Sequence, residues 1–120
     1  RGLTPHLFTS RRIHASMPSN VKITVIKVTD PKEYFPVSPI KQDKPLPPCQ
    51  IHEEGQEYLV GPDMKMPEGF CHWAWGHIKS GATTLSYGGS YPWNAEPKVS
   101  IECCTDGLRP VVYKLERIED

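Results

Sequence analysis

The residues of this chain that are best suited to chemistry are its four cysteines, Cys49, Cys71, Cys103 and Cys104. No secretory signal peptide is recognised, so a disulfide framework is not the first expectation. A thiolate is both a nucleophile and a ligand for soft metals. The cysteines therefore indicate metal binding, thiol catalysis, or small buried side chains with a purely structural role.

A metal site would draw its ligands from separate parts of the chain. The Cys49-x-x-His52 spacing is compatible with two ligands from one turn. Cys71 and one of the pair Cys103/Cys104 would complete a tetrahedral set. Soft thiolate ligands select zinc or iron over magnesium or calcium. The metal hypothesis thus names Cys49, His52, Cys71 and Cys104 as ligands, with zinc or iron as the cofactor.

Thiol catalysis would centre on Cys71, which lies near the start of a predicted helix. Free amide groups and the helix dipole at such a position stabilise a thiolate. Arg109 could bind an anion or a carboxylate, or could pair with a neighbouring acid. His52 or His77 could carry a proton. The catalytic hypothesis names Cys71, Arg109 and His77, in a pocket between the helix start and the C-terminal hairpin.

Common catalytic and nucleotide-binding signatures are absent from the sequence. It has no Walker A, Gly-x-Gly-x-x-Gly, Gly-x-Ser-x-Gly, EF-hand or His-Glu-x-x-His pattern. The sequence therefore identifies candidate groups but no particular reaction.

The pattern of apolar and turn residues predicts the elements that position these groups. Residues 21–28 alternate and are rich in β-branched side chains, and residues 56–60 form a second short strand. Asp106-Gly107 lies between two β-rich runs, 99–104 and 109–118, which predicts a hairpin. We expect an α+β fold whose small antiparallel sheet, in the chain order β-β-α-β-β, is covered by one main helix.

The helix is predicted over residues 67–80. Pro67 suits its first position, and Gly81 is expected to end it. Gly76 within it could allow a close approach of another element. The side chains spaced to form the buried face are Cys71, Ala74, Trp75 and Ile78.

The two adjacent cysteines should face opposite sides of their strand, because side chains alternate along a strand. Ile101 and Cys103 share one face, and Glu102 and Cys104 share the other. Since Ile101 is apolar and Glu102 is charged, we expect Cys103 to be buried in the core. Cys104 should then be the cysteine that takes part in any site on the hairpin.

Composition limits the classes of protein and partner. The chain has 120 residues, which suits one domain, and 14 Lys and Arg balance 14 Asp and Glu. A net charge of zero argues against nucleic-acid binding through bulk positive charge. No apolar run approaches the roughly 18–20 residues of a membrane-spanning helix. The expected partner is a small molecule or a metal ion, with no nucleic acid and no membrane; the sequence does not indicate an oligomeric state.

Two segments differ in composition from the rest. The first sixteen residues contain arginine, serine and threonine but no acid, as in a mitochondrial transit peptide. We therefore separate a disordered or transit-like arm at 1–18 from a single domain at 19–120. The expected location is cytoplasmic or the mitochondrial matrix rather than secreted. Residues 31–48 hold six prolines and should form an extended loop, which a non-catalytic binding module could use for recognition.

Three motifs give the chain a resemblance to known sequences: FCHWAW at 70–75, GGSYPW at 88–93 and CCTDGLRPV at 103–111. They resemble a family of small conserved-hypothetical proteins of bacteria, archaea and some fungi. The resemblance covers about residues 21–118 and implies the domain boundaries. That family has no firmly assigned function, so the resemblance implies no catalytic residue. The N-terminal arm and the proline-rich segment at 31–48 depart from the family pattern.

Overall fold

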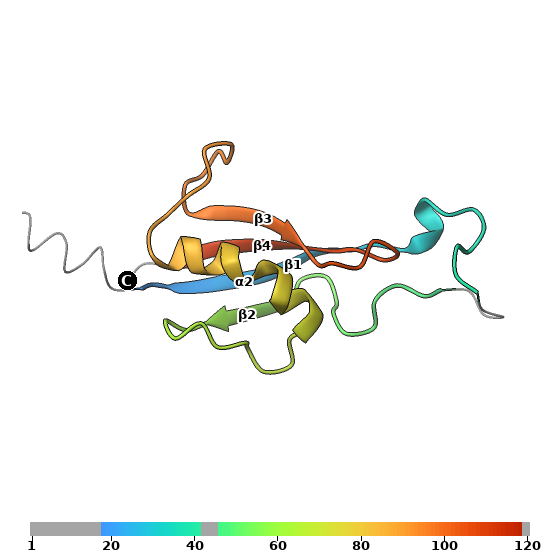
Figure 1. Ribbon diagram of the computed structural model, residues 1–120, viewed down its shortest axis with the longest axis horizontal. Coiled ribbons are helices and arrows are strands. Elements are labelled where there is room, and N and C mark those ends of the chain that lie inside the picture. The colour runs from blue at the N-terminus through green and yellow to red at the C-terminus, as the bar shows by residue number, and fades with distance from the viewer. Residues whose placement is uncertain (1–17, 42–45, 119–120) are drawn as a thin grey trace, which may run out of the picture.

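The computed structural model describes residues 18–41 and 46–118, so the arm predicted at 1–18 lies outside the described residues except for its last position. The predicted α+β class and chain order are confirmed (Figure 1). Within the described residues the elements are β1 (Asn20–Val28), a 3-10 turn η1 (Pro31–Glu33), β2 (Glu57–Val60), α2 (His72–Ser86), β3 (Val99–Cys103) and β4 (Val111–Ile118).

The four strands form one antiparallel sheet in the order β2-β1-β4-β3. The long strands β1 and β4 lie at its centre, and a bulge between Val25 and Lys27 interrupts their pairing. Alternate residues of each central strand are fully buried, because successive side chains point to opposite faces. They are Val21, Ile23 and Val25 in β1, as the sequence predicts, and Val111, Tyr113 and Leu115 in β4.

Helix α2 covers one face of this sheet (Figure 1). Ala74 and Ile78 are buried on its inner side, as the spacing of apolar residues predicts, and Ala82 and Leu85 continue the same stripe. Cys71 and Trp75 pack at the edge of the core. No helix in the described ranges is both long and apolar enough to span a bilayer.

The boundaries predicted for the helix are wrong at both ends. Residues 67–70 form a turn in which the Phe70 amide bonds to the Pro67 carbonyl, and Gly69 has a φ of 82° that a right-handed helix does not contain. The helix therefore begins at His72, with Cys71 as its N-cap. At the other end, Gly88 has a φ of 87° and its amide bonds to the Leu85 carbonyl, so Gly88 rather than Gly81 follows the last turn.

Gly81 instead provides the close approach that the sequence assigned to Gly76. A Cβ atom at position 81 would lie 2.7 Å from the carboxyl carbon of Glu102 on β3, which is too close for an ordinary contact. A Cβ at position 76 would meet nothing within 4 Å, because Gly76 is on the exposed side of the helix. The lack of a side chain at Gly81 therefore lets the helix pack closely against the edge strand β3.

The face of β3 that packs on the helix is also the opposite of the predicted one. Ser100 is buried, whereas Ile101 is 54% exposed and Cys103 is exposed. The Ser100 hydroxyl donates to Glu102 Oε2 at 2.6 Å, so the two polar side chains on the inner face satisfy each other beside Gly81. The prediction that Cys103 is buried is wrong for this reason. Cys104 does lie on the Glu102 side and packs against the core.

Candidate functional site

A cavity of about 370 Å³ lies between the start of α2, the end of the β3–β4 hairpin and residues 49–52. It brings together five residues that the sequence singled out, although they come from distant parts of the chain: Cys49, His52, Cys71, Cys104 and Arg109. The other residues of its wall are Ile51, Trp73, Thr105, Asp106, Val111 and Tyr113.

Cys71 occupies the N-cap of the 15-residue helix α2, with an extended backbone at φ −70° and ψ 120°. Its carbonyl accepts the Trp75 amide at 2.9 Å, but its side chain makes no capping hydrogen bond. The first turn of the helix contains no acidic residue. Amides at a helix start have no partner within the helix, so Cys71 lies beside free backbone donors.

The remaining cavity cysteines are held differently. The Cys104 sulfur accepts a hydrogen bond from the Val111 amide at 3.3 Å, and the Cys104 amide donates to the Val111 carbonyl at 3.0 Å. Cys49 is half-buried and packs at the edge of the core. All of these cysteines are free. Cys103 does not line the cavity and is the most accessible of the four.

His52 is buried, and its Nδ1 lies in a hydrogen-bonded group with Gln56 and Tyr58. Gln56 Oε1 accepts the Glu53 amide at 3.0 Å and the Tyr58 hydroxyl at 3.1 Å, which identifies that atom as an oxygen. His52 Nδ1 lies 3.2 Å from the same oxygen and 3.2 Å from the Tyr58 hydroxyl oxygen. Burial lowers the pKa of His52, and the Gln56 contact opposes that shift. Burial therefore favours the neutral ring.

Tyr113 is a buried wall residue that the sequence did not indicate for the site. It is fully buried on β4, and its ring meets the His52 ring edge-on with centroids 5.6 Å apart. Burial raises the pKa of Tyr113 far above its usual range, and the neighbouring Cys104 and Cys71 raise it further. The phenol is thus a neutral hydrogen-bond donor. A tyrosine among the inward-facing apolar positions of β4 is the signal that could have indicated it.

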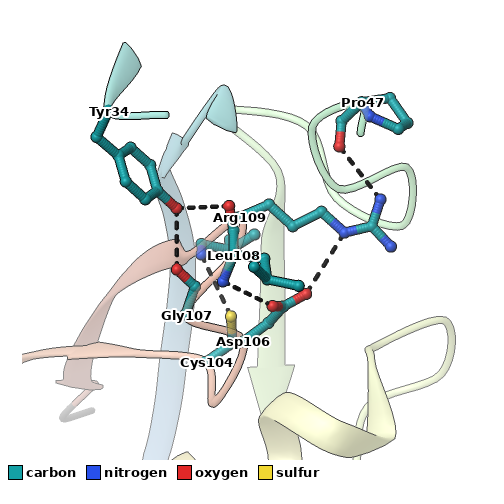
Figure 2. Close-up of polar contacts among 8 residues, drawn as sticks. Tyr34, Pro47, Cys104, Asp106, Gly107, Leu108 and Arg109 are labelled. Carbon is teal, nitrogen blue, oxygen red and sulfur yellow. Dashed lines mark hydrogen bonds and ion pairs between the residues drawn. The ribbon is translucent and has the colours of Figure 1, made fainter. Parts of the chain in front are cut away.

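Arg109 belongs to a set of contacts at the end of the hairpin (Figure 2). Its Nε lies 3.4 Å from Asp106 Oδ2, and its Nη1 donates to the Pro47 carbonyl at 3.2 Å. Asp106 Oδ1 accepts the Leu108 amide at 2.9 Å and so shapes the turn. The positive charge of Arg109 is matched by Asp106, which weakens the expectation that Arg109 is a free anion site.

The proline-rich segment also contacts this hairpin end. The Tyr34 hydroxyl lies 2.5 Å from the Leu108 carbonyl oxygen and 3.0 Å from that of Gly107 (Figure 2). Together with the Pro47 contact, two positions of the segment are bound to the hairpin that forms one wall of the cavity.

Two expectations for the site are not matched by the placement of side chains. His77 is exposed on α2 and does not line the cavity. Cys49, His52, Cys71 and Cys104 share the cavity, yet in the part of the chain that the structure describes no group of three or more His, Cys, Asp or Glu side chains is arranged to hold a metal ion. The cavity unites the predicted ligands without bringing them into a coordination shell.

Comparison of the chain with protein-family models, with curated proteins and with solved structures finds no match.

Proposed function

We propose that the protein binds a small molecule in the cysteine-lined cavity and reacts with it through the thiolate of Cys71. The observation that carries the proposal is the placement of Cys71. Its sulfur is at the uncapped start of α2 and on the wall of a cavity large enough for a small ligand. The walls contributed by Ile51, Trp73 and Val111 favour an apolar portion of that ligand.

The chemistry follows from the groups in the wall. The Cys71 sulfur attacks an electrophilic carbon of the ligand, a sulfur–carbon bond forms, and the leaving group departs with the bonding electron pair. The thiol proton must leave before or during this attack. The proton passes to solvent, because His52 Nε2 has no hydrogen-bond partner among the described residues and His77 lies outside the cavity.

The rate of alkylation of each cysteine tests this proposal. The intact protein is treated with iodoacetamide between pH 5 and 9, and the four sites are quantified by peptide mass spectrometry. Cys103 is the internal control, because it is exposed and lies outside the cavity. Although Cys71 is less accessible, it should react about tenfold faster than Cys103 at pH 7.

A second measurement separates reactivity from accessibility. The rate at Cys71 should stay above the rate at Cys103 from pH 6 to 9, because the cavity holds the reagent beside the Cys71 sulfur, whereas Cys103 is open to solvent. A Cys71 that reacts no faster than Cys103 throughout this range would overturn the proposal. The variant Cys71→Ser should lose the fast-reacting site and keep the rates at the other cysteines.

A further inference from the structure

Strand β3 is an outer strand of the sheet, and its open edge carries backbone groups without a partner (Figure 1). In an antiparallel ladder every second residue directs both its amide and its carbonyl to the neighbouring strand. Cys104, whose amide donates to the Val111 carbonyl of β4, is such a residue. Ile101 and Cys103 are therefore turned the other way, and their amides and carbonyls point to the open edge. Within the described residues no hydrogen bond reaches these groups.

The side chains along this edge are apolar on the face away from the helix. Val99, Ile101 and Cys103 share that face, and the last two are exposed. Folded proteins rarely leave an apolar edge strand open, because it can pair with another strand. The other edge strand, β2, has four residues rather than five and presents the exposed Glu57, which forms an ion pair with Lys22. The β3 edge is thus the one suited to bind a further strand.

The face of β3 towards the helix carries charges that complement each other about Ser100. The ladder with β4 continues to Lys98, whose carbonyl accepts the Arg117 amide at 2.8 Å. Lys98, Ser100 and Glu102 therefore follow one another on the same face. If a second β3 pairs antiparallel about Ser100, Glu102 lies opposite Lys98 of the second copy, and a two-fold axis repeats this contact. The charges of this strand thus match those of an identical strand.

A shift of the pairing by one residue loses this match. With Ile101 on the axis, the two Glu102 carboxylates would lie diagonally across it, where like charges repel. With Ser100 on the axis, the open Ile101 amide donates to the Val99 carbonyl of the second copy, and the axis repeats this hydrogen bond. The same register places the Ile101 side chain beside Val99 of the second copy, so apolar groups meet on the outer face.

We propose that β3 binds the β3 strand of a second copy of this chain, antiparallel and about Ser100, so that the two sheets become continuous. This inference goes beyond the proposed function and does not involve the cavity. The pairing of two five-residue edges buries little surface, and interfaces below about 1,200 Å² are typically weak. We expect a dissociation constant on the order of 10 µM.

Sedimentation velocity of the full chain tests the proposal. The average mass should rise from that of one chain at about 1 µM to near that of two chains at about 200 µM. Amide hydrogen exchange at the same two concentrations gives a second measurement. Peptides that contain Ile101 should exchange more slowly at the higher concentration, because the edge amide is then hydrogen-bonded.

Ile101→Pro removes the edge amide itself. This amide does not bond to β4, so proline is compatible with the strand, and circular dichroism checks the fold. The dissociation constant should rise at least about tenfold. Ile101→Val keeps the amide and should leave the dissociation constant within about threefold. In the control Leu59→Pro the lost amide points to the open edge of β2, because the neighbouring Tyr58 pairs with β1, and the dimer should persist.

Lys98→Glu tests the register through an exposed position. It places a carboxylate opposite Glu102 of the second copy, so the dissociation constant should rise about tenfold at low salt and by less in about 0.5 M sodium chloride.

Each outcome decides for or against the pairing. A mass of one chain over the whole concentration range would overturn it and leave the edge to an extended segment of a different protein. A dimer that persists in folded Ile101→Pro would overturn it in favour of another surface. If Ile101→Pro does not fold, Lys98→Glu decides, and an unchanged dissociation constant in that variant would overturn the pairing about Ser100. None of these results affects the reactivity proposed for Cys71.

Discussion

Alanine at position 81 should destabilise the protein, although alanine at position 76 of the same helix should stabilise it. Both glycines lie inside α2, where alanine is favoured over glycine by about 1 kcal/mol. At Gly76 nothing lies within 4 Å of the added Cβ, so that gain is realised in full. At Gly81 the added Cβ would meet the Glu102 carboxylate.

The contact at Gly81 determines the size of the effect. The Glu102 side chain must move, which breaks the 2.6 Å hydrogen bond that Oε2 accepts from Ser100. A hydrogen bond to a charged group contributes about 1.5–3 kcal/mol, which exceeds the gain in helix propensity. We therefore expect Gly81→Ala to lower the free energy of unfolding by about 1 kcal/mol, or the melting temperature by about 4 °C.

Urea and thermal unfolding followed by circular dichroism measure both variants under identical conditions. Glu102→Ala removes the obstacle, so Gly81→Ala in that background should become stabilising by about 1 kcal/mol, as at Gly76. The packing assigned to Gly81 is refuted if Gly81→Ala stabilises the wild-type protein as much as Gly76→Ala does.

Three further predictions concern the cavity. Burial lowers the pKa of His52 below its ordinary value of 6.5, so protonation favours the unfolded chain. The free energy of unfolding should therefore fall as the pH drops below 6.5 and level off below the folded-state pKa. Urea unfolding of the wild type and of His52→Phe should differ in how this free energy changes with pH, and an equal change in both would contradict the prediction. Cys104→Ala should lower the free energy of unfolding by about 1 kcal/mol, because packing and the Val111 contact are lost, whereas Cys103→Ala should change it by less than about 0.5 kcal/mol. The reverse order in urea unfolding would mean that Cys103 is the buried cysteine, as the sequence predicted. Elemental analysis of the purified protein should find less than about a tenth of an equivalent of zinc or iron, and a chelator should leave unfolding unchanged; a full equivalent whose removal unfolds the protein would establish the metal hypothesis instead.

The sequence predicted the elements whose pattern is local. Alternation in residues 21–28 predicts β1, and the apolar spacing from Cys71 to Ile78 predicts the buried face of α2. It also selected five residues of the cavity wall, because each had a chemical type suited to a site.

The errors arise where a contact between distant residues decides the outcome. The face of β3 depends on the room that Gly81 leaves for Glu102, which no pattern within 99–104 reveals. The role of Gly81 itself depends on that strand. The contacts of His52 with Gln56 and Tyr58, and the unpartnered hydroxyl of Tyr113, likewise depend on how distant segments pack. These are properties of the packed chain rather than of local spacing.

The two contacts between the proline-rich segment and the hairpin end have a consequence for chain length. Tyr34 and Pro47 both bind the same hairpin end, so the two ends of the stretch between them are held close together. The entropy of closing such a loop grows only with the logarithm of its length, and doubling it costs about 0.6 kcal/mol. Inserted residues between these two positions should therefore change the stability of the sheet very little. An insertion there should likewise leave the hairpin wall of the cavity in place.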